Sequence, residues 1–153
     1  MKIRRPIDNR GQALVELSLI VIPLAVLLFG IAEIGRGWYY SNTLTNGARA
    51  GARLASKLPN KDKDDTFDQR IKSYTFSQVT GFIPNRNMFV NLSAYAPDLS
   101  ARNSPIGADV ERRDAITVIV RYDFNVLTGG IIPYFSGTFP MVRKATMYYE
   151  WEE

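Results

Sequence analysis

The sequence predicts an α+β protein in which a long N-terminal transmembrane helix extends into a small head of one short helix and a three-stranded antiparallel sheet. Three observations support this fold class: an apolar run over residues 13–32, a helix-compatible continuation to Leu58, and alternating apolar residues in the remainder. The chain is expected to divide into a basic leader (1–11), a transmembrane and stalk helix (12–58) and an extracytoplasmic head (59–153).

The composition excludes several classes of chemistry. The 153 residues include no Cys and no His, so disulfides, Cys/His zinc sites and catalysis through a thiol or an imidazole are ruled out. No nucleotide-binding loop, serine-hydrolase motif or paired-carboxylate motif is found, so we expect a non-enzyme with no catalytic residues, no cofactor and no metal. Most of the net charge of +4 lies in the first 11 residues, which disfavours nucleic acid as a partner.

The apolar run over residues 13–32 has the length of a membrane span. Its 20 residues rise about 30 Å as a helix, which matches a hydrocarbon core, and Glu16 is its one charged residue. Trp38, Tyr39 and Tyr40 follow within two turns and are expected to anchor the helix at the headgroup layer. The basic leader predicts a cytoplasmic N-terminus and an exported head.

Two other interpretations remain open for this segment. Gly30-Ile31-Ala32 resembles a signal-peptidase site, and cleavage after Ala32 would release a secreted module. The apolar run is longer than the usual core of a signal peptide, and the aromatic residues would then begin a soluble protein without a physical reason, so retention is favoured. Alternatively, the chain is an uncleaved membrane-anchored binding domain in which Glu16 is incidental.

Gly11, Gln12 and Glu16 form a motif at the start of the apolar run. If the chain is cut after Gly11, Gln12 carries a new α-amine, and Glu16 lies one helical turn away on the same face. In a staggered bundle, Glu16 of one subunit can neutralise the Gln12 amine of another, which sets the axial register of the helices.

These features resemble the leader of type IV pilins and pseudopilins, and a longer set resembles the TadE-like family of tight-adherence (Tad/Flp) pilus assembly proteins. The resemblance implies a minor pilin or pseudopilin of the bacterial inner membrane, cut by a prepilin peptidase between Gly11 and Gln12. It implies other pilins, the peptidase, the assembly platform and the bilayer as partners, and a role in cell adhesion. Leu17 stands where major pilins of this type carry an aromatic residue. The resembling segments are Arg10–Glu16, Pro23-Leu24, Gly30–Arg36 and Leu44–Arg53.

Two stripes of side chains follow the span on the stalk helix. The small-residue stripe consists of Gly47, Gly51 and Ala55, with Ala48 and Ala52 beside them. Small residues at this spacing let another backbone approach closely, either from a neighbouring subunit or from the head of the same chain. The basic stripe consists of Arg49, Arg53 and Lys57, and it is either a solvated face or a contact for anionic lipid or an acidic partner.

The head is predicted to contain one helix and three strands. The helix spans about 66–79 and points Phe67, Ile71, Tyr74 and Val79 inward. The strands are expected at 88–96, 115–124 and 141–151, with the end of the stalk helix laid on the sheet. The apolar loop over residues 131–139 is either a lid on the core or an exposed patch for a protein contact.

Overall fold

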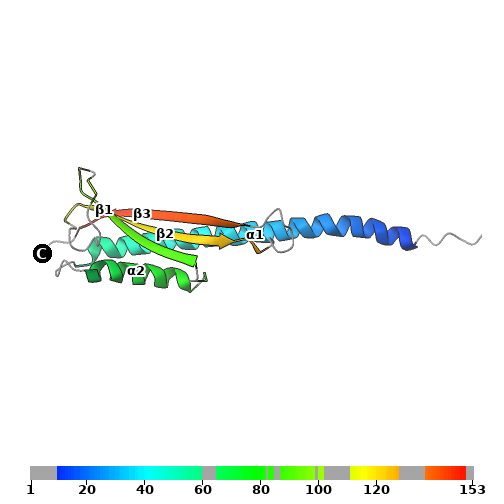
Figure 1. The fold of residues 1–153 in the computed structure, drawn as a ribbon, viewed down its shortest axis with the longest axis horizontal. Coiled ribbons are helices and arrows are strands. Elements are labelled where there is room, and N and C mark those ends of the chain that lie inside the picture. The colour runs from blue at the N-terminus through cyan, green and yellow to red at the C-terminus, as the bar shows by residue number, and fades with distance from the viewer. Residues whose placement is uncertain are drawn as a thin grey trace, which may run out of the picture.

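The computed structural model describes residues 10–59, 65–81, 83–84, 87–98, 100–101, 111–127 and 137–150. The helix α1 (Arg10–Lys57) is 48 residues long and continues through Pro23 without ending. Its N-terminal half projects from the rest of the molecule, and its C-terminal half forms part of the head (Figure 1). This is the long helix that the sequence predicts, and it ends just before Pro59, which cannot continue a helix.

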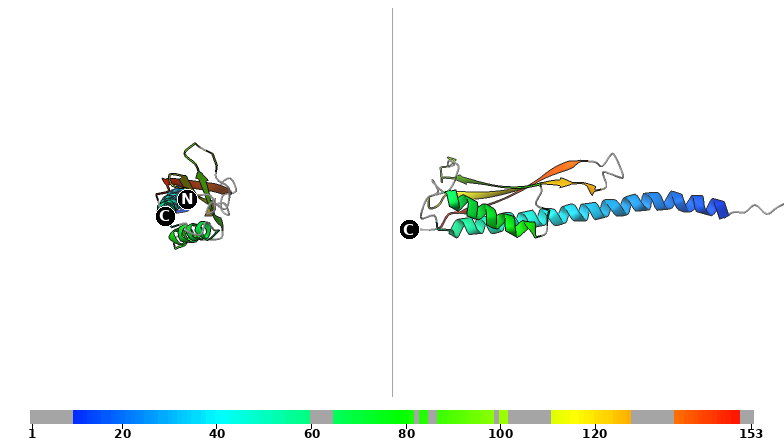
Figure 2. Two further views of the ribbon diagram at one scale, coloured as in Figure 1. Left: turned by 90° about the vertical axis from the view of Figure 1, so that its left-hand side faces the viewer. Right: turned by 60° about the horizontal axis from the view of Figure 1, so that its bottom comes forward.

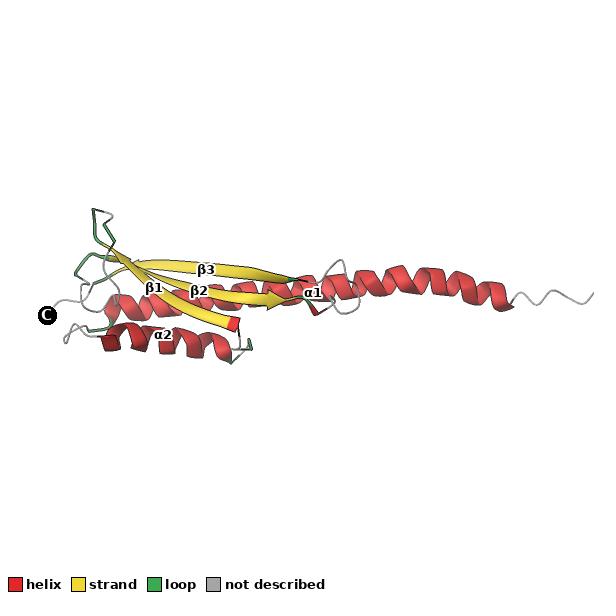
Figure 3. Cartoon of the chain, viewed as in Figure 1, coloured by secondary structure: helices red, strands yellow, loops and turns green. Residues whose placement is uncertain are grey.

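The head contains the remaining elements: α2 (Asp65–Thr80), β1 (Met88–Tyr95), β2 (Ala115–Asn125) and β3 (Thr138–Tyr148). The strands form one antiparallel sheet in the order β1-β2-β3 (Figure 3). The α+β fold class and the three-stranded antiparallel sheet are therefore confirmed.

The core of the head lies around α1, which packs between the sheet and α2 (Figure 2). The central strand β2 contributes Ile116, Val118 and Val120, all fully buried, because alternate residues of a strand point to the same face. Alternate residues of β1 and β2 face the core; these are Met88, Val90, Leu92 and Ala94, and Ile116, Val118, Val120 and Tyr122.

Two details of the prediction differ from the structure. Tyr74 was expected to point inward from α2, but it is exposed, and Thr75 is fully buried in its place. The narrow space against α1 accepts a threonine, whose hydroxyl bonds the carbonyl of Ile71, whereas a tyrosine ring would not fit there. Of the loop predicted over residues 131–139, most lies outside the described residues, and Phe139 belongs to β3.

The strand β3 runs alongside α1 in the same direction, and this fixes the level of the head along the helix. Near its start, Met141 lies beside Gly37. Further along, Arg143 donates to the Ser41 hydroxyl at 2.6 Å, and after the end of β3 the Glu150 amide donates to the carbonyl of Ser56 at 3.0 Å. The end of the sheet at the β2–β3 connection is therefore level with residues of α1 just after the apolar run.

Candidate functional site

The projecting half of α1 exposes an apolar surface. From residue 11 to residue 32 every side chain is exposed except Ala25, which is half-buried. This helix is long and apolar enough to cross a membrane. A water-exposed helix needs a polar face, and this segment has none, so it requires a lipid or protein environment.

The start of α1 brings together the residues of the predicted cleavage motif. The side-chain amide of Gln12 donates a hydrogen bond to a carboxylate oxygen of Glu16 at 3.0 Å, so the two side chains share one helix face. A Cβ added to Gly11 would meet no atom within 4 Å. The carboxylate is therefore within reach of groups at position 12 and is open to other chains.

The three aromatic residues expected at the membrane interface separate into two groups. Trp38 and Tyr39 are exposed. Tyr40 instead turns toward the sheet, where its ring packs edge-on against Tyr122 at 5.5 Å and Phe124 at 5.6 Å between ring centroids. Adjacent positions of a helix point about 100° apart, so only one of the three faces the head. The role of these three residues at the membrane interface remains a prediction.

The environment of Tyr122 in this aromatic cluster shifts the pKa of its hydroxyl. Burial raises the pKa of Tyr122 above its usual value of 10.0; nearby Tyr40 also raises this pKa, whereas nearby Arg36 lowers it. The Tyr122 hydroxyl therefore ionises less readily than that of a free tyrosine.

The small-residue stripe packs inside the chain, against α2. A Cβ on Gly47 would lie 2.2 Å from Cγ2 of Val79, and a Cβ on Gly51 would lie 2.0 Å from Oγ1 of Thr75. Ala48, Ala52 and Ala55 are fully buried. Of the two partners considered for this stripe, the structure shows the head of the same chain.

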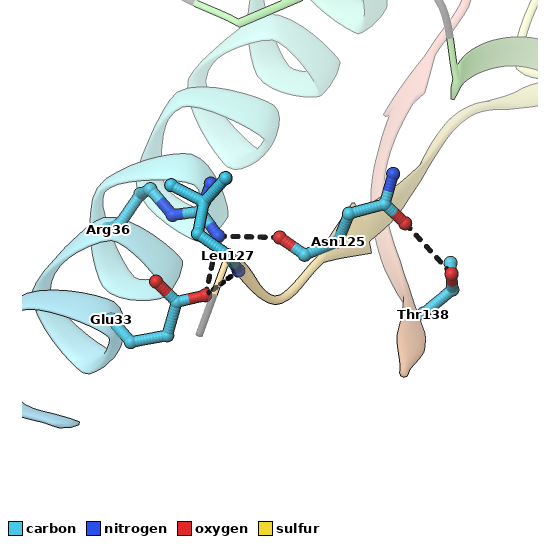
Figure 4. Close-up of polar contacts among 5 residues, drawn as sticks. All are labelled: Glu33, Arg36, Asn125, Leu127 and Thr138. Atoms are coloured by element: carbon cyan, nitrogen blue, oxygen red, sulfur yellow. Dashed lines mark hydrogen bonds and ion pairs between the residues drawn. The ribbon is translucent and has the colours of Figure 1, made fainter. Parts of the chain in front are cut away.

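A polar clamp joins α1 to the β2–β3 connection (Figure 4). Glu33 pairs with Arg36 at 2.6 Å and accepts a hydrogen bond from the amide of Leu127 at 2.8 Å. Arg36 donates to the carbonyl of Asn125 at 2.5 Å, and its guanidinium lies over the ring of Phe124, 4.5 Å from the centroid. The clamp was not predicted from the sequence. Its one local signal was an acid and a base three residues apart at the end of the apolar run.

Replacing Glu33 with alanine should open the clamp without unfolding the head. The Leu127 amide loses its acceptor, a loss of about 1 kcal/mol, so its hydrogen exchange should accelerate about fivefold. The Tyr149 amide, which donates to the carbonyl of Asp114 at the far end of the sheet, serves as an internal control and should exchange at the wild-type rate. Unchanged exchange at Leu127 would contradict the clamp.

The basic stripe lies on the exposed face of α1. Arg49, Arg53 and Lys57 line a shallow groove together with Lys144 of β3. Arg49 is about 25 Å along the helix from Ala32, well beyond the ~8–10 Å over which exposed charges interact at physiological salt. If residues 13–32 form an upright span, the basic stripe lies far from the bilayer surface, which favours a solvated face or an acidic partner over anionic lipid.

The acidic residues beside β2 have local structural partners. The carboxylate of Asp114 accepts a hydrogen bond from the Glu111 amide at 2.9 Å, and Asp123 pairs with Arg121 at 3.2 Å. Within the described part of the chain, no group of three His, Cys, Asp or Glu side chains is placed to hold a metal ion.

The structure is that of a chain whose N-terminal helix is half exposed and apolar and half embedded in an α+β head. The model of the TadE-like protein family matches residues 11–53, and this confirms the resemblance over most of α1. The chain is similar to TadE-like proteins over this segment, and the match ends before α2 and the sheet begin. Comparison with curated proteins gave no match, and comparison with solved structures gave none.

Proposed function

We propose that this protein is a minor pilin or pseudopilin that takes part in the assembly of a Tad-type pilus. In this proposal α1 spans the bacterial inner membrane with its N-terminus in the cytoplasm. A prepilin peptidase cuts between Gly11 and Gln12, and the exposed half of α1 then enters a helical bundle with other pilins at the assembly platform. The observation that carries the proposal is the exposed apolar half of α1, which lies within the matched residues 11–53.

The free energy of moving α1 from the bilayer into the helical bundle indicates a role for Glu16. A lipid tail is as apolar as a leucine, so moving α1 from bilayer to bundle gains little from the hydrophobic effect. Specific polar contacts must then select the register. A carboxylate in a membrane helix costs up to about 2.5–3.5 kcal/mol at the centre and less near an end. Pairing Glu16 with a Gln12 amine of a neighbouring subunit would offset this cost and fix the stagger.

The two alternatives account for fewer of the observations. A secreted module cut after Ala32 would discard residues 11–32, which are about half of the segment that the family matches. An uncleaved anchored binding domain would retain them, but it gives no reason for a carboxylate on the first turns of an otherwise apolar helix. The proposed function accounts both for residues 11–32 and for the carboxylate of Glu16.

The N-terminus of the mature protein tests the proposal. Protein purified from its native membrane should begin at Gln12, whereas a start at Met1 supports the uncleaved anchor and a start at Glu33 supports the secreted module. Intact-mass measurement and N-terminal sequencing distinguish the three. The matched control is Gly11→Val, which should keep the leader; the structure shows open space around Gly11, so the change should leave the fold intact.

A further inference from the structure

We propose that the β2–β3 rim, defined as residues 125–127 and 137–139, rests in the lipid interface of the membrane that holds α1. This surface contact goes beyond the proposed function, because it requires only that α1 is inserted. It needs neither cleavage after Gly11 nor a pilus.

The clamp sets the position of the rim along α1. The Leu127 amide is bonded to Glu33, the residue directly after the apolar run, and the Asn125 carbonyl is bonded to Arg36 one turn later. In the sheet, Asn125 is paired with Thr138, so both sides of the rim lie at this level. The rim is therefore attached to the first turn of α1 beyond the span (Figure 4).

The level of the rim relative to the bilayer follows from Trp38. This side chain is exposed and suits the headgroup layer. Glu33 precedes it by five residues, or about 8 Å of helix, toward the apolar run. Headgroups occupy roughly 5–8 Å on each side of the hydrocarbon core. With Trp38 among the headgroups, Glu33 and the rim attached to it lie at the boundary between headgroups and acyl chains.

The side chains of the rim suit that environment. Leu127 is 70% exposed and Phe139 is 58% exposed, although both are large and apolar. The charges nearby are paired: Glu33 with Arg36, and Asp123 with Arg121. A surface with exposed apolar groups and compensated charge is stabilised by contact with a lipid interface and gains nothing from water.

Lipid is the occupant that the geometry favours, because the rim is hydrogen-bonded to Glu33, the first residue after the exposed apolar run. The sheet packs directly against α1, so its end stands beside the helix at the bilayer surface. A second copy of the chain would have to displace lipid that is already there when α1 is inserted.

Site-specific fluorescence tests this contact in the full chain. The sequence has no cysteine, so a single Cys at Leu127 or Phe139 gives one labelling position on an exposed side chain. The labelled protein is reconstituted in nanodiscs that contain lipids with a nitroxide at the headgroup or the upper acyl chain. Ile31→Cys in the span is the positive control, and Tyr148→Cys is the negative control. Tyr148 is also exposed and lies about 30 Å from Phe139 along β3.

Labels at positions 127 and 139 should be quenched at least about threefold more than a label at position 148. Quenching at 31 with none at 127 and 139 would overturn the proposal. If another subunit covered the rim, the two labels would be shielded from lipid nitroxides and their emission would shift to the blue, which also overturns it. Because none of these readouts depends on processing, a chain that starts at Met1 would refute the cleavage step and leave this test intact.

Discussion

Replacing Gly51 with leucine should strongly destabilise the head. A Cβ at this position would already lie 2.0 Å from the Thr75 hydroxyl oxygen, and leucine adds three further carbons. Thr75 is fully buried and its hydroxyl bonds the Ile71 carbonyl, so α2 as a whole must move away. Overpacking of this kind costs about 3 kcal/mol or more. The thermal midpoint of the full chain in detergent, followed by circular dichroism, should fall by roughly 10 °C or more.

Gly35 provides the matched control for this substitution. It lies on the same helix, and a Cβ there would meet no atom within 4 Å. Gly35→Leu should therefore leave the midpoint unchanged or raise it slightly, since leucine is the better helix former. In the milder Gly51→Ala variant, adding Thr75→Ala removes the clashing oxygen and should recover part of the loss. A Gly51→Leu protein that melts with the wild type would show that α1 and α2 do not pack as described.

Replacing Glu16 with alanine should abolish assembly while leaving membrane insertion intact. Alanine removes a carboxylate from the span, so insertion becomes easier. The bundled helix, however, loses the partner of the Gln12 amine, and breaking one side of a buried pair costs about 3–5 kcal/mol. We expect about a 100-fold fall in the amount of the protein in sheared filaments, measured by immunoblot against an unchanged amount in the membrane fraction.

Two further variants show whether the negative charge of Glu16 is what assembly requires. Ser18→Ala changes an exposed side chain on the same part of α1, whose hydroxyl bonds only the carbonyl of Val15 among the contacts described, and it should assemble normally. Glu16→Gln keeps the shape and the possible hydrogen bond to Gln12 but loses the charge, and it should fail as Glu16→Ala does. Normal piliation in both Glu16 variants would show that Glu16 does not set the register of the helices. It would not change the expectation that the mature chain begins at Gln12.

The secondary structure could be predicted because its signals are local. The strands alternate apolar and polar residues, and their observed bounds differ from the expected ones by at most three residues at each end. For the same reason, the 20-residue apolar run predicts a candidate span, and Pro59 predicts the end of α1. The match of the family to residues 11–53 rests on that same segment.

By itself, the sequence determined the fold class, the candidate span and the family resemblance, because each depends on the order and period of neighbouring residues. Only the tertiary structure decided which partner each helix face meets. It turned Tyr40 toward the sheet, exposed Tyr74, packed the small-residue stripe on α2 of the same chain and joined Glu33 to Leu127 across 94 positions. A helix pattern records that a face is apolar, small or charged, whereas the surface that covers it depends on contacts between residues far apart in the chain.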